Sequence, residues 1–161
     1  MSQRITMDQL LEMMRDPDVP QSEITKYIRV IPNTQRPFSP TVLTDPYKVD
    51  VGPQAQAAQV TEWVIEAAVE RRQELYRRKI SNDWDGLRLV SEGDSWFQHP
   101  SFLWIDGYDL IDFLFDKYAI YCSAFAGDTL QNMMSGMADL KVDIEREDAK
   151  GLLFSAGGND I

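Results

Sequence analysis

The chain has 161 residues, a length typical of one domain with an appendage. Hydrophobic residues make up 43% of it and aromatic residues 11%, which is enough for a buried core and excludes a wholly disordered chain. The formal net charge of −10 repels phosphate backbones and anionic lipid surfaces, so we expect neither a nucleic-acid partner nor a role at a membrane surface.

The only cysteine is Cys122, so an internal disulfide is excluded and a reducing compartment is indicated. It lies in the apolar run "AIYCSAF", where we expect a small buried thiol rather than a reactive one. One cysteine and one histidine do not make a metal site by themselves, and we expect no metal and no other cofactor. The N-terminus lacks the layout of a signal peptide, and no apolar run approaches the ~18 residues of a membrane span. We therefore expect a cytoplasmic protein.

Residues 1–54 are predicted to form a helical hairpin followed by a Pro-rich connector. A capping box, Thr6-x-x-Gln9, begins the first helix. Its apolar stripe has the spacing i, i+3, i+4, i+7 and consists of Met7, Leu10, Leu11 and Met14. A similar spacing predicts the second helix, from Ile24, Tyr27, Ile28 and Ile31, which Pro32 ends. Residues 32–54 hold five prolines and are interpreted as an extended connector that contacts the surface through Phe38, Val42, Leu43 and Tyr47.

Residues 55–85 are predicted to be an amphipathic helix that leads into the main domain. Its apolar face consists of Val60, Trp63, Val64, Ala67, Ala68 and Leu75. The last turns are rich in Arg and Lys, which suits the negative end of a helix dipole. We interpret Trp63 as a packing residue.

From residue 86 onward, apolar strands alternate with helices. The strands are predicted at 87–93, 119–127 and 151–158, and the helices at 105–118 and 128–140. Strands that are apolar throughout indicate parallel pairing with helices over both faces of an α/β sheet. The buried stripes of the two helices are predicted to be Leu110, Ile111, Leu114 and Tyr118 in the first, and Leu130, Met133, Met134 and Met137 in the second.

Each predicted strand ends in a polar turn that contains glycine, and parallel sheets bind ligands beyond the carboxyl ends of their strands. Ser95 follows the first strand and is expected to face outward. Gly127 follows the second strand and supplies a backbone amide, and Asn159 follows the third and supplies a carboxamide. A hydroxyl flanked by two such donors suits acyl transfer, because the donors stabilise the oxyanion that forms as the serine attacks a carbonyl. When each of the three turns is taken alone, ordinary turn chemistry explains it better than a function does, and only their order at successive strand ends favours the site.

Taken in order, Gly93-Asp94-Ser95, Gly127 and Gly157-Gly158-Asn159-Asp160 resemble the first three sequence blocks of the SGNH (GDSL-type) hydrolases. The resemblance covers roughly residues 86–161, and the chain closely resembles a bacterial subgroup with "GDSWF", "AGDTL" and "GGNDI". The resemblance implies a flavodoxin-like three-layer α/β/α fold and the hydrolysis of esters. It also implies that Ser95 is the nucleophile, that its own amide and that of Gly127 are oxyanion donors, and that Asn159 is the third donor. Asp160 is interpreted as structural.

The family's fourth block, Asp-x-x-His, supplies the base and its orienting aspartate, and this chain contains no such pattern. The resemblance therefore implies the N-terminal portion of a hydrolase domain that lacks the catalytic His and Asp. His99 lies four residues after Ser95, but Pro100 disfavours the helical geometry that would bring the two together. We expect His99 to line the cleft beside Trp96 and Phe97, which either wall an acyl pocket or pack in the core.

Two other functions are considered. A catalytically inactive pseudo-hydrolase would keep the fold and bind a ligand or a protein. A nucleotide-binding domain is disfavoured, because neither of the common phosphate-binding glycine motifs occurs. For the hydrolase, the expected partner is a small-molecule ester. Self-association is also expected, either through the N-terminal helices or through the uncovered outer edge of the third strand.

Overall fold

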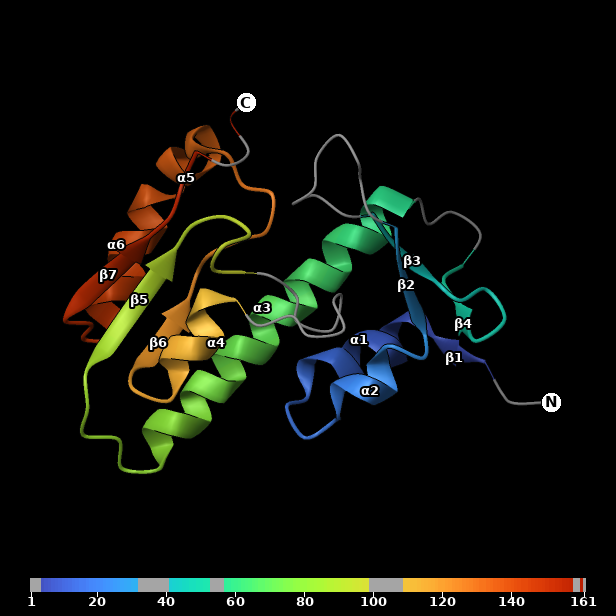
Figure 1. Ribbon diagram of the computed structural model, residues 1–161, viewed down its shortest axis with the longest axis horizontal. Helices are drawn as coiled ribbons and strands as arrows, with labels where there is room; N and C mark the ends of the chain where they lie inside the picture. The colour runs from blue at the N-terminus through green and yellow to red at the C-terminus, as the bar shows by residue number, and fades with distance from the viewer. Residues whose placement is uncertain (1–3, 32–40, 53–56, 99–108, 158–159, 161) are drawn as a thin grey trace. The chain divides into compact units, whose positions relative to one another are not determined.

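The structure is a computed structural model, and it describes residues 4–31, 41–52, 57–98, 109–157 and 160. The described residues up to Arg71 form one compact unit, and those from Arg72 onward form a second. The long helix α3 (Ala57–Ser81) contributes its first part to the first unit and its last part to the second (Figure 1).

The first unit begins with a short strand, which was not predicted, and with the capped helix that was. Strand β1 (Ile5–Thr6) leads into α1 (Met7–Arg15), and the capping box between Thr6 and Gln9 is confirmed in both directions. The predicted apolar stripe is confirmed as well, since all of its members are buried: Met7, Leu10, Leu11 and Met14. The stripe lies in the unit's own core with residues of α3, so the first helix has its apolar face covered within the unit.

The predicted second helix is wrong in its second half. Helix α2 (Gln21–Ile24) is a single turn, and the chain then enters strand β2 (Ile28–Ile31). This strand pairs antiparallel with β3 (Thr41–Thr44), in a register that places Ile28 opposite Thr44. The spacing of the apolar residues in "YIRVI" fits both the helical repeat and the alternation of a strand. Isoleucine and valine favour the strand when a partner strand is present. The partner lies in the segment that was interpreted as a connector.

That segment therefore carries more structure than a connector. In β3, Val42 is fully buried, and β4 (Val49–Asp50) pairs in parallel with β1. Tyr47, which was predicted to pack on the surface, is 87% exposed, and Phe38 lies outside the described residues. The buried apolar residues of the unit thus come from its strands and helices alike.

Helix α3 confirms the predicted helix but only part of its apolar face. Val60, Val64, Ala67 and Ala68 are buried in the first unit, and Trp63 packs against the same core. Leu75, by contrast, is 37% exposed, and Tyr76 is the fully buried residue of the last part of the helix. The two parts of the helix pack into different cores. The buried face of α3 therefore changes along the helix, and a single apolar stripe does not describe both parts.

The second unit is built on a parallel sheet, as predicted. It contains β5 (Arg88–Glu92), β6 (Ala119–Cys122) and β7 (Gly151–Phe154), in the order β6-β5-β7. Both pairings of the central strand β5 are parallel. Among the described residues, β7 pairs with β5 alone, and its Leu152 and Phe154 are 43% and 49% exposed. The expectation of an uncovered outer edge agrees with this finding, whereas self-association stays a prediction.

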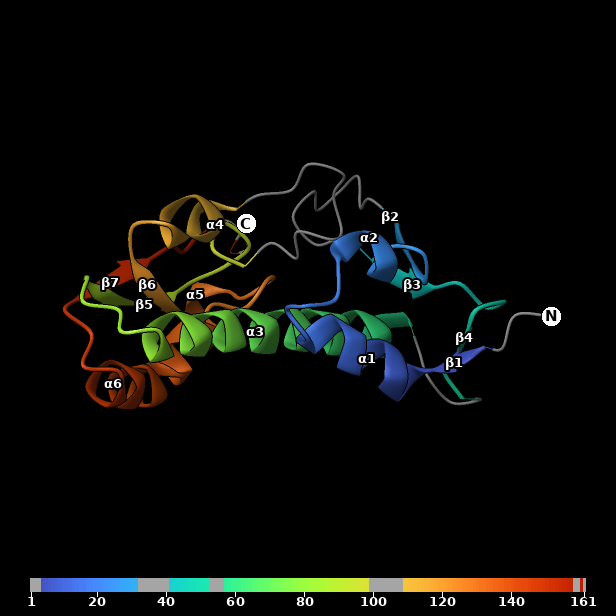
Figure 2. The same ribbon diagram turned by 90° about the horizontal axis from the view of Figure 1, so that it is seen from below.

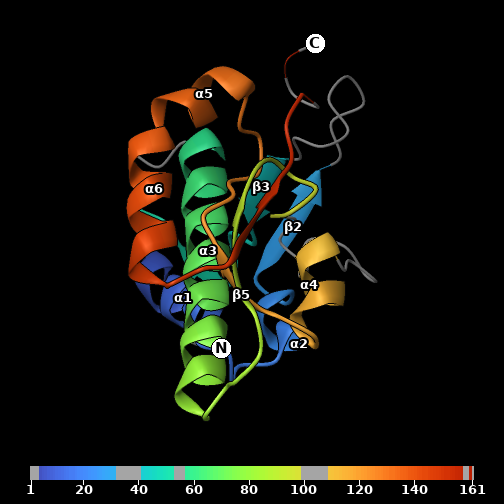
Figure 3. The ribbon, with the colours of Figure 1, turned by 90° about the vertical axis from the view of Figure 1, so that its left-hand side faces the viewer.

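Helices cover both faces of this sheet (Figures 2 and 3). On one face lie α3 and α6 (Met137–Arg146), and the buried residues of this cluster are Tyr76, Val90, Ala119, Tyr121 and Leu140. On the other face lies α4 (Leu110–Phe115), and the buried residues there are Phe97, Ile111, Ile120, Cys122 and Ala124. Burial raises the pKa of the Cys122 thiol, which agrees with the expected unreactive core cysteine. The unit is a mixed α/β structure, and none of the helices in the described part of the chain combines the length and apolarity needed to cross a membrane.

The predicted helix stripes in this unit need correction. In α4, Ile111 is buried but Leu110 is 48% exposed, and residues 105–108 lie outside the described part. The helix predicted at 128–140 is in fact two helices, α5 (Leu130–Ser135) and α6, separated at Gly136. Of its predicted stripe Met133 alone is buried, and the exposed members are Leu130, Met134 and Met137. A break in a helix changes the rotation of every residue after it, so a stripe counted across Gly136 does not remain on one face.

Candidate functional site

Ser95 is the second residue of a tight helical turn that follows β5. The turn, Asp94–Gln98, is closed by the N–H groups of Phe97 and Gln98, which donate to the carbonyl of Asp94 at 3.0 and 3.1 Å. Ser95 is only 7% exposed, so little of the residue is accessible, and the outward direction expected for its hydroxyl stays a prediction. Within the described part of the chain, neither the hydroxyl nor the backbone N–H of Ser95 makes a hydrogen bond. We call residues Asp94–Gln98 the Ser95 turn.

Gly93 is required just before this turn because of a close approach. A Cβ atom at this position would lie 2.7 Å from the carbonyl oxygen of Ser155, which follows β7. Atoms at that separation overlap, so a larger residue would push the ends of β5 and β7 apart. The glycine of the first motif therefore sets how closely the two strand ends pack.

Gly127 is a glycine for a different reason. Its φ is +96°, a backbone conformation that side chains disfavour, and no atom lies near the position of a Cβ. The residue is exposed, and its N–H makes no hydrogen bond to any other described residue. In the turn after β6, the exposed Gly127 therefore presents an N–H that no other described residue accepts.

Hydrogen bonds join the three predicted turns to one another. The N–H of Phe125 donates to the carbonyl of Gly93 at 3.0 Å, which ties the turn after β6 to the turn after β5. The hydroxyl of Ser155 donates to Asp94 Oδ1 at 2.7 Å, which ties the end of β7 to the Ser95 turn.

The third link runs between the last two motifs. The carboxylate of Asp160 accepts the N–H of Leu130 at 3.0 Å, at the start of α5, in agreement with the structural role predicted for Asp160. The structure thus brings together the turns that carry Ser95, Gly127 and Asp160, while Asn159 and His99 lie outside the described residues.

The site is strongly acidic on the face of the sheet that α6 covers. Glu92, directly before Gly93, is 8% exposed, and burial, followed by the charges of Asp128 and Asp143, raises its pKa to about 7. Burial also raises the pKa of Asp128. Asp143 accepts the hydroxyl of Ser123 at 2.8 Å and pairs with Arg146 at 2.8 Å. Across the residues that the structure describes, no group of three or more His, Cys, Asp and Glu side chains could hold a metal ion.

The two aromatic residues of the Ser95 turn have different environments. Phe97 is 5% exposed and packs in the core beneath α4, whereas Trp96 is 60% exposed. Of the two interpretations left open for this pair, core packing applies to Phe97. Trp96 is the aromatic side chain that is accessible beside Ser95.

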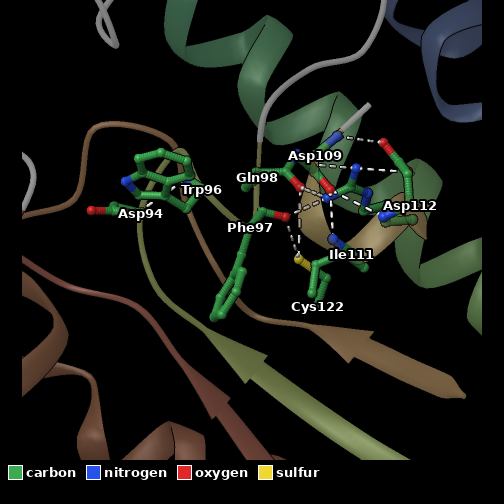
Figure 4. A network of polar contacts seen from close by, with 9 residues as sticks. Asp94, Trp96, Phe97, Gln98, Asp109, Ile111, Asp112 and Cys122 are labelled. Carbon is green, nitrogen blue, oxygen red and sulfur yellow. Dashed lines mark hydrogen bonds and ion pairs between the residues drawn. The ribbon is translucent and has the colours of Figure 1, made fainter. Parts of the chain in front are cut away.

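A buried arginine that sequence reasoning missed lies behind the turn. The guanidinium of Arg72, on α3, contacts Gln98, Asp109 and Asp112, which lie close together in Figure 4. Arg72 was interpreted as part of a basic helix end. A signal in the sequence was available, since Asp109-x-x-Asp112 is the capping box that begins α4. Its pairing with Arg72 depends on the tertiary structure.

A scan with protein-family models, a search of curated proteins and a search of solved structures each returned no match.

Proposed function

We propose that the second unit carries the nucleophile and oxyanion donors of a serine ester hydrolase of the SGNH type. The observation that carries the proposal is the set of hydrogen bonds that holds the three motif turns together at the carboxyl ends of parallel strands. The strand order supports it further. In chain order, the sheet reads second, first, third, which is how a flavodoxin-like sheet begins. A three-layer α/β/α domain of that kind is part of the proposal.

In the proposed reaction, Ser95 Oγ forms a bond to the carbonyl carbon of an ester, and its proton passes to a base. The oxyanion accepts hydrogen bonds from the N–H groups of Ser95 and Gly127 and from the carboxamide of Asn159. Collapse of this intermediate releases the alcohol, which takes up the proton, and water then hydrolyses the acyl-serine. Among the described residues no group accepts the N–H of Ser95 or of Gly127, which supports their part in this scheme. The base would come from a histidine outside the three turns, as in the family pattern.

A fluorophosphonate probe tests the proposal, because it labels a serine only when that serine is activated. We expect the full-length gene product to be labelled at Ser95, and Ser95→Ala to abolish labelling. Ser135→Ala, at the last residue of α5, serves as the matched control and should be labelled like the wild type. Labelling that persists in Ser95→Ala, or none in the wild type, would refute the proposal.

One observation favours the inactive alternative, a pseudo-hydrolase that binds a ligand or a protein. Ser95 is nearly buried, and its hydroxyl has no acceptor in the part of the chain that the structure describes. A serine without a base is a poor nucleophile at neutral pH. This second function predicts that the wild type is not labelled but is stabilised by short-chain esters in a thermal shift assay. The same esters should not stabilise Gly127→Trp.

A further inference from the structure

The buried guanidinium of Arg72 connects α3 to the start of α4. Its side chain is 11% exposed, and its Nη2 atom lies 2.6 Å from Asp109 Oδ2 and 2.9 Å from Asp112 Oδ1. Asp109 is the N-cap of α4, and its carboxylate also accepts the N–H groups of Ile111 and Asp112. Burial alone would lower the pKa of Arg72, but Asp109 and then the other nearby acidic groups raise it above its ordinary value. The guanidinium is therefore held charged and in one orientation.

The same guanidinium holds the end of the Ser95 turn. Its Nη1 atom donates to the carbonyl oxygen of Phe97 and to Gln98 Oε1, the latter at 3.1 Å (Figure 4). The N–H of Leu110, at the start of α4, donates to the carbonyl of Trp96 at 3.3 Å. The three residues that follow Ser95 are thus tied to α3 and α4 from behind, on the side of the sheet that α4 covers.

The start and the end of the turn are held by different parts of the molecule. Asp94, at the start, is bound to Ser155 after β7, whereas Gln98, at the end, is bound to Arg72. Ser95 lies between the two attachments. A planar guanidinium can donate to a carbonyl, a carboxamide and two carboxylates at once, and a lysine ammonium cannot reproduce that geometry.

We propose that Arg72 is a positioning residue for Ser95, which fixes the Ser95 turn by joining its end to the N-terminus of α4. The proposal rests on the proposed function in one respect, that Ser95 is the reacting group. A reacting atom that is displaced by about 1 Å can lose about 100-fold in rate. Loss of Arg72 should therefore reduce the reactivity of Ser95 without removing any group that touches the substrate.

The test compares Arg72 with its neighbour on the same helix. Arg71 is a matched control because its guanidinium likewise donates to backbone carbonyls, those of Met14, Asp16, Pro17 and Val19 in the first unit. The second-order rate of fluorophosphonate labelling is measured on the full-length product for Arg72→Met, Arg72→Lys, Gln98→Met and Arg71→Met. Gln98→Met leaves the ion pairs of Arg72 intact, so it and Arg72→Lys decide the question if Arg72→Met does not fold.

We expect labelling of Arg72→Met to be about 100-fold slower than that of the wild type. Arg72→Lys and Gln98→Met should fall between the two, and Arg71→Met should label at the wild-type rate. A further variant, Arg72→Ala, should also be labelled slowly, and added methylguanidinium should partly restore its labelling rate. A variant that is slow only because it is unstable would not be restored in this way. Equal rates for the Arg72 variants and the wild type, or equal slowing by Arg71→Met, would overturn the proposal.

If the wild type is not labelled, the proposed function fails, and hydrogen exchange decides the inference by itself. In that case the amides of Phe97 and Gln98 should exchange at least about 10-fold faster in Arg72→Met, and they should be unchanged in Arg71→Met. Unchanged exchange at these two amides in Arg72→Met would show that Arg72 does not hold the turn.

Discussion

The buried carboxyl of Glu92 predicts an unusual dependence of stability on pH. A group whose pKa is raised by folding binds a proton more readily in the folded state than in the unfolded state. Between pH 4.5 and about 7, Glu92 is protonated in the folded chain and ionised in the unfolded one. The free energy of unfolding should therefore decrease as the pH rises through this window. A shift from 4.5 to about 7 corresponds to at most about 3 kcal/mol.

The substitution Glu92→Gln removes the charge and keeps the shape of the side chain. We expect the variant to match the wild type near pH 4, where Glu92 is protonated in both states. At pH 8 it should be more stable by up to about 3 kcal/mol, because no carboxylate has to be buried beside Asp128 and Asp143. Urea unfolding at half-unit steps from pH 4 to pH 8 measures both effects.

Glu145→Gln provides the matched control, since Glu145 is an exposed carboxylate on α6 in the same unit. Its curve of stability against pH should follow that of the wild type. The reasoning would be refuted if Glu92→Gln and the wild type lost stability in parallel between pH 5 and pH 7. A Glu92→Gln variant less stable than the wild type at pH 8 would refute it as well.

Three further substitutions test the packing of the second unit. Gly93→Ala places a Cβ 2.7 Å from the carbonyl oxygen of Ser155 and should destabilise the protein by about 1–3 kcal/mol in urea unfolding; a neutral effect would contradict the close approach. Met133→Ala should cost about 2–5 kcal/mol and Met134→Ala less than about 0.5 kcal/mol, because the two side chains are 2% and 64% exposed, and equal costs would restore the original helix stripe. Asp160→Ala removes the carboxylate that accepts the first N–H of α5 and should cost about 1 kcal/mol by chemical denaturation, while Asp160→Asn should cost less.

Helices and strands were predictable from the sequence where the spacing of their apolar residues fits only one kind of secondary structure. Strands β5 and β6 begin in short apolar runs, β5 ends directly before Gly93, and α1 has a capping box and a single apolar stripe. In each case the local signals point to the same structure, so the tertiary structure had nothing to override. The turn that carries Ser95 was found for the same reason, whereas the strand predicted at 119–127 ends at Cys122, so Gly127 lies five residues beyond β6 rather than at its end.

Segments whose apolar spacing fits more than one structure were not predictable. Ile28–Ile31 fits a helix by spacing and a strand by composition, and only its pairing with β3 decides between them. Leu75 and Tyr76 are both apolar neighbours on α3, and which of them is buried depends on the direction from which the sheet approaches. The residues near Leu75 and Tyr76 in the sequence do not show from which side the sheet packs on α3.

For the candidate site, the sequence by itself determined the types of residue at the strand ends, a serine after one strand and glycines with special backbone requirements beside it. Only the tertiary structure decided how they are joined, through the bonds from Phe125 to Gly93, from Ser155 to Asp94 and from Leu130 to Asp160. It alone brought Arg72 behind the Ser95 turn and placed Glu92 beside two other carboxylates. The physical reason is range: turn and strand preferences act over a few residues, whereas hydrogen bonds and buried charges depend on partners that are distant in the chain.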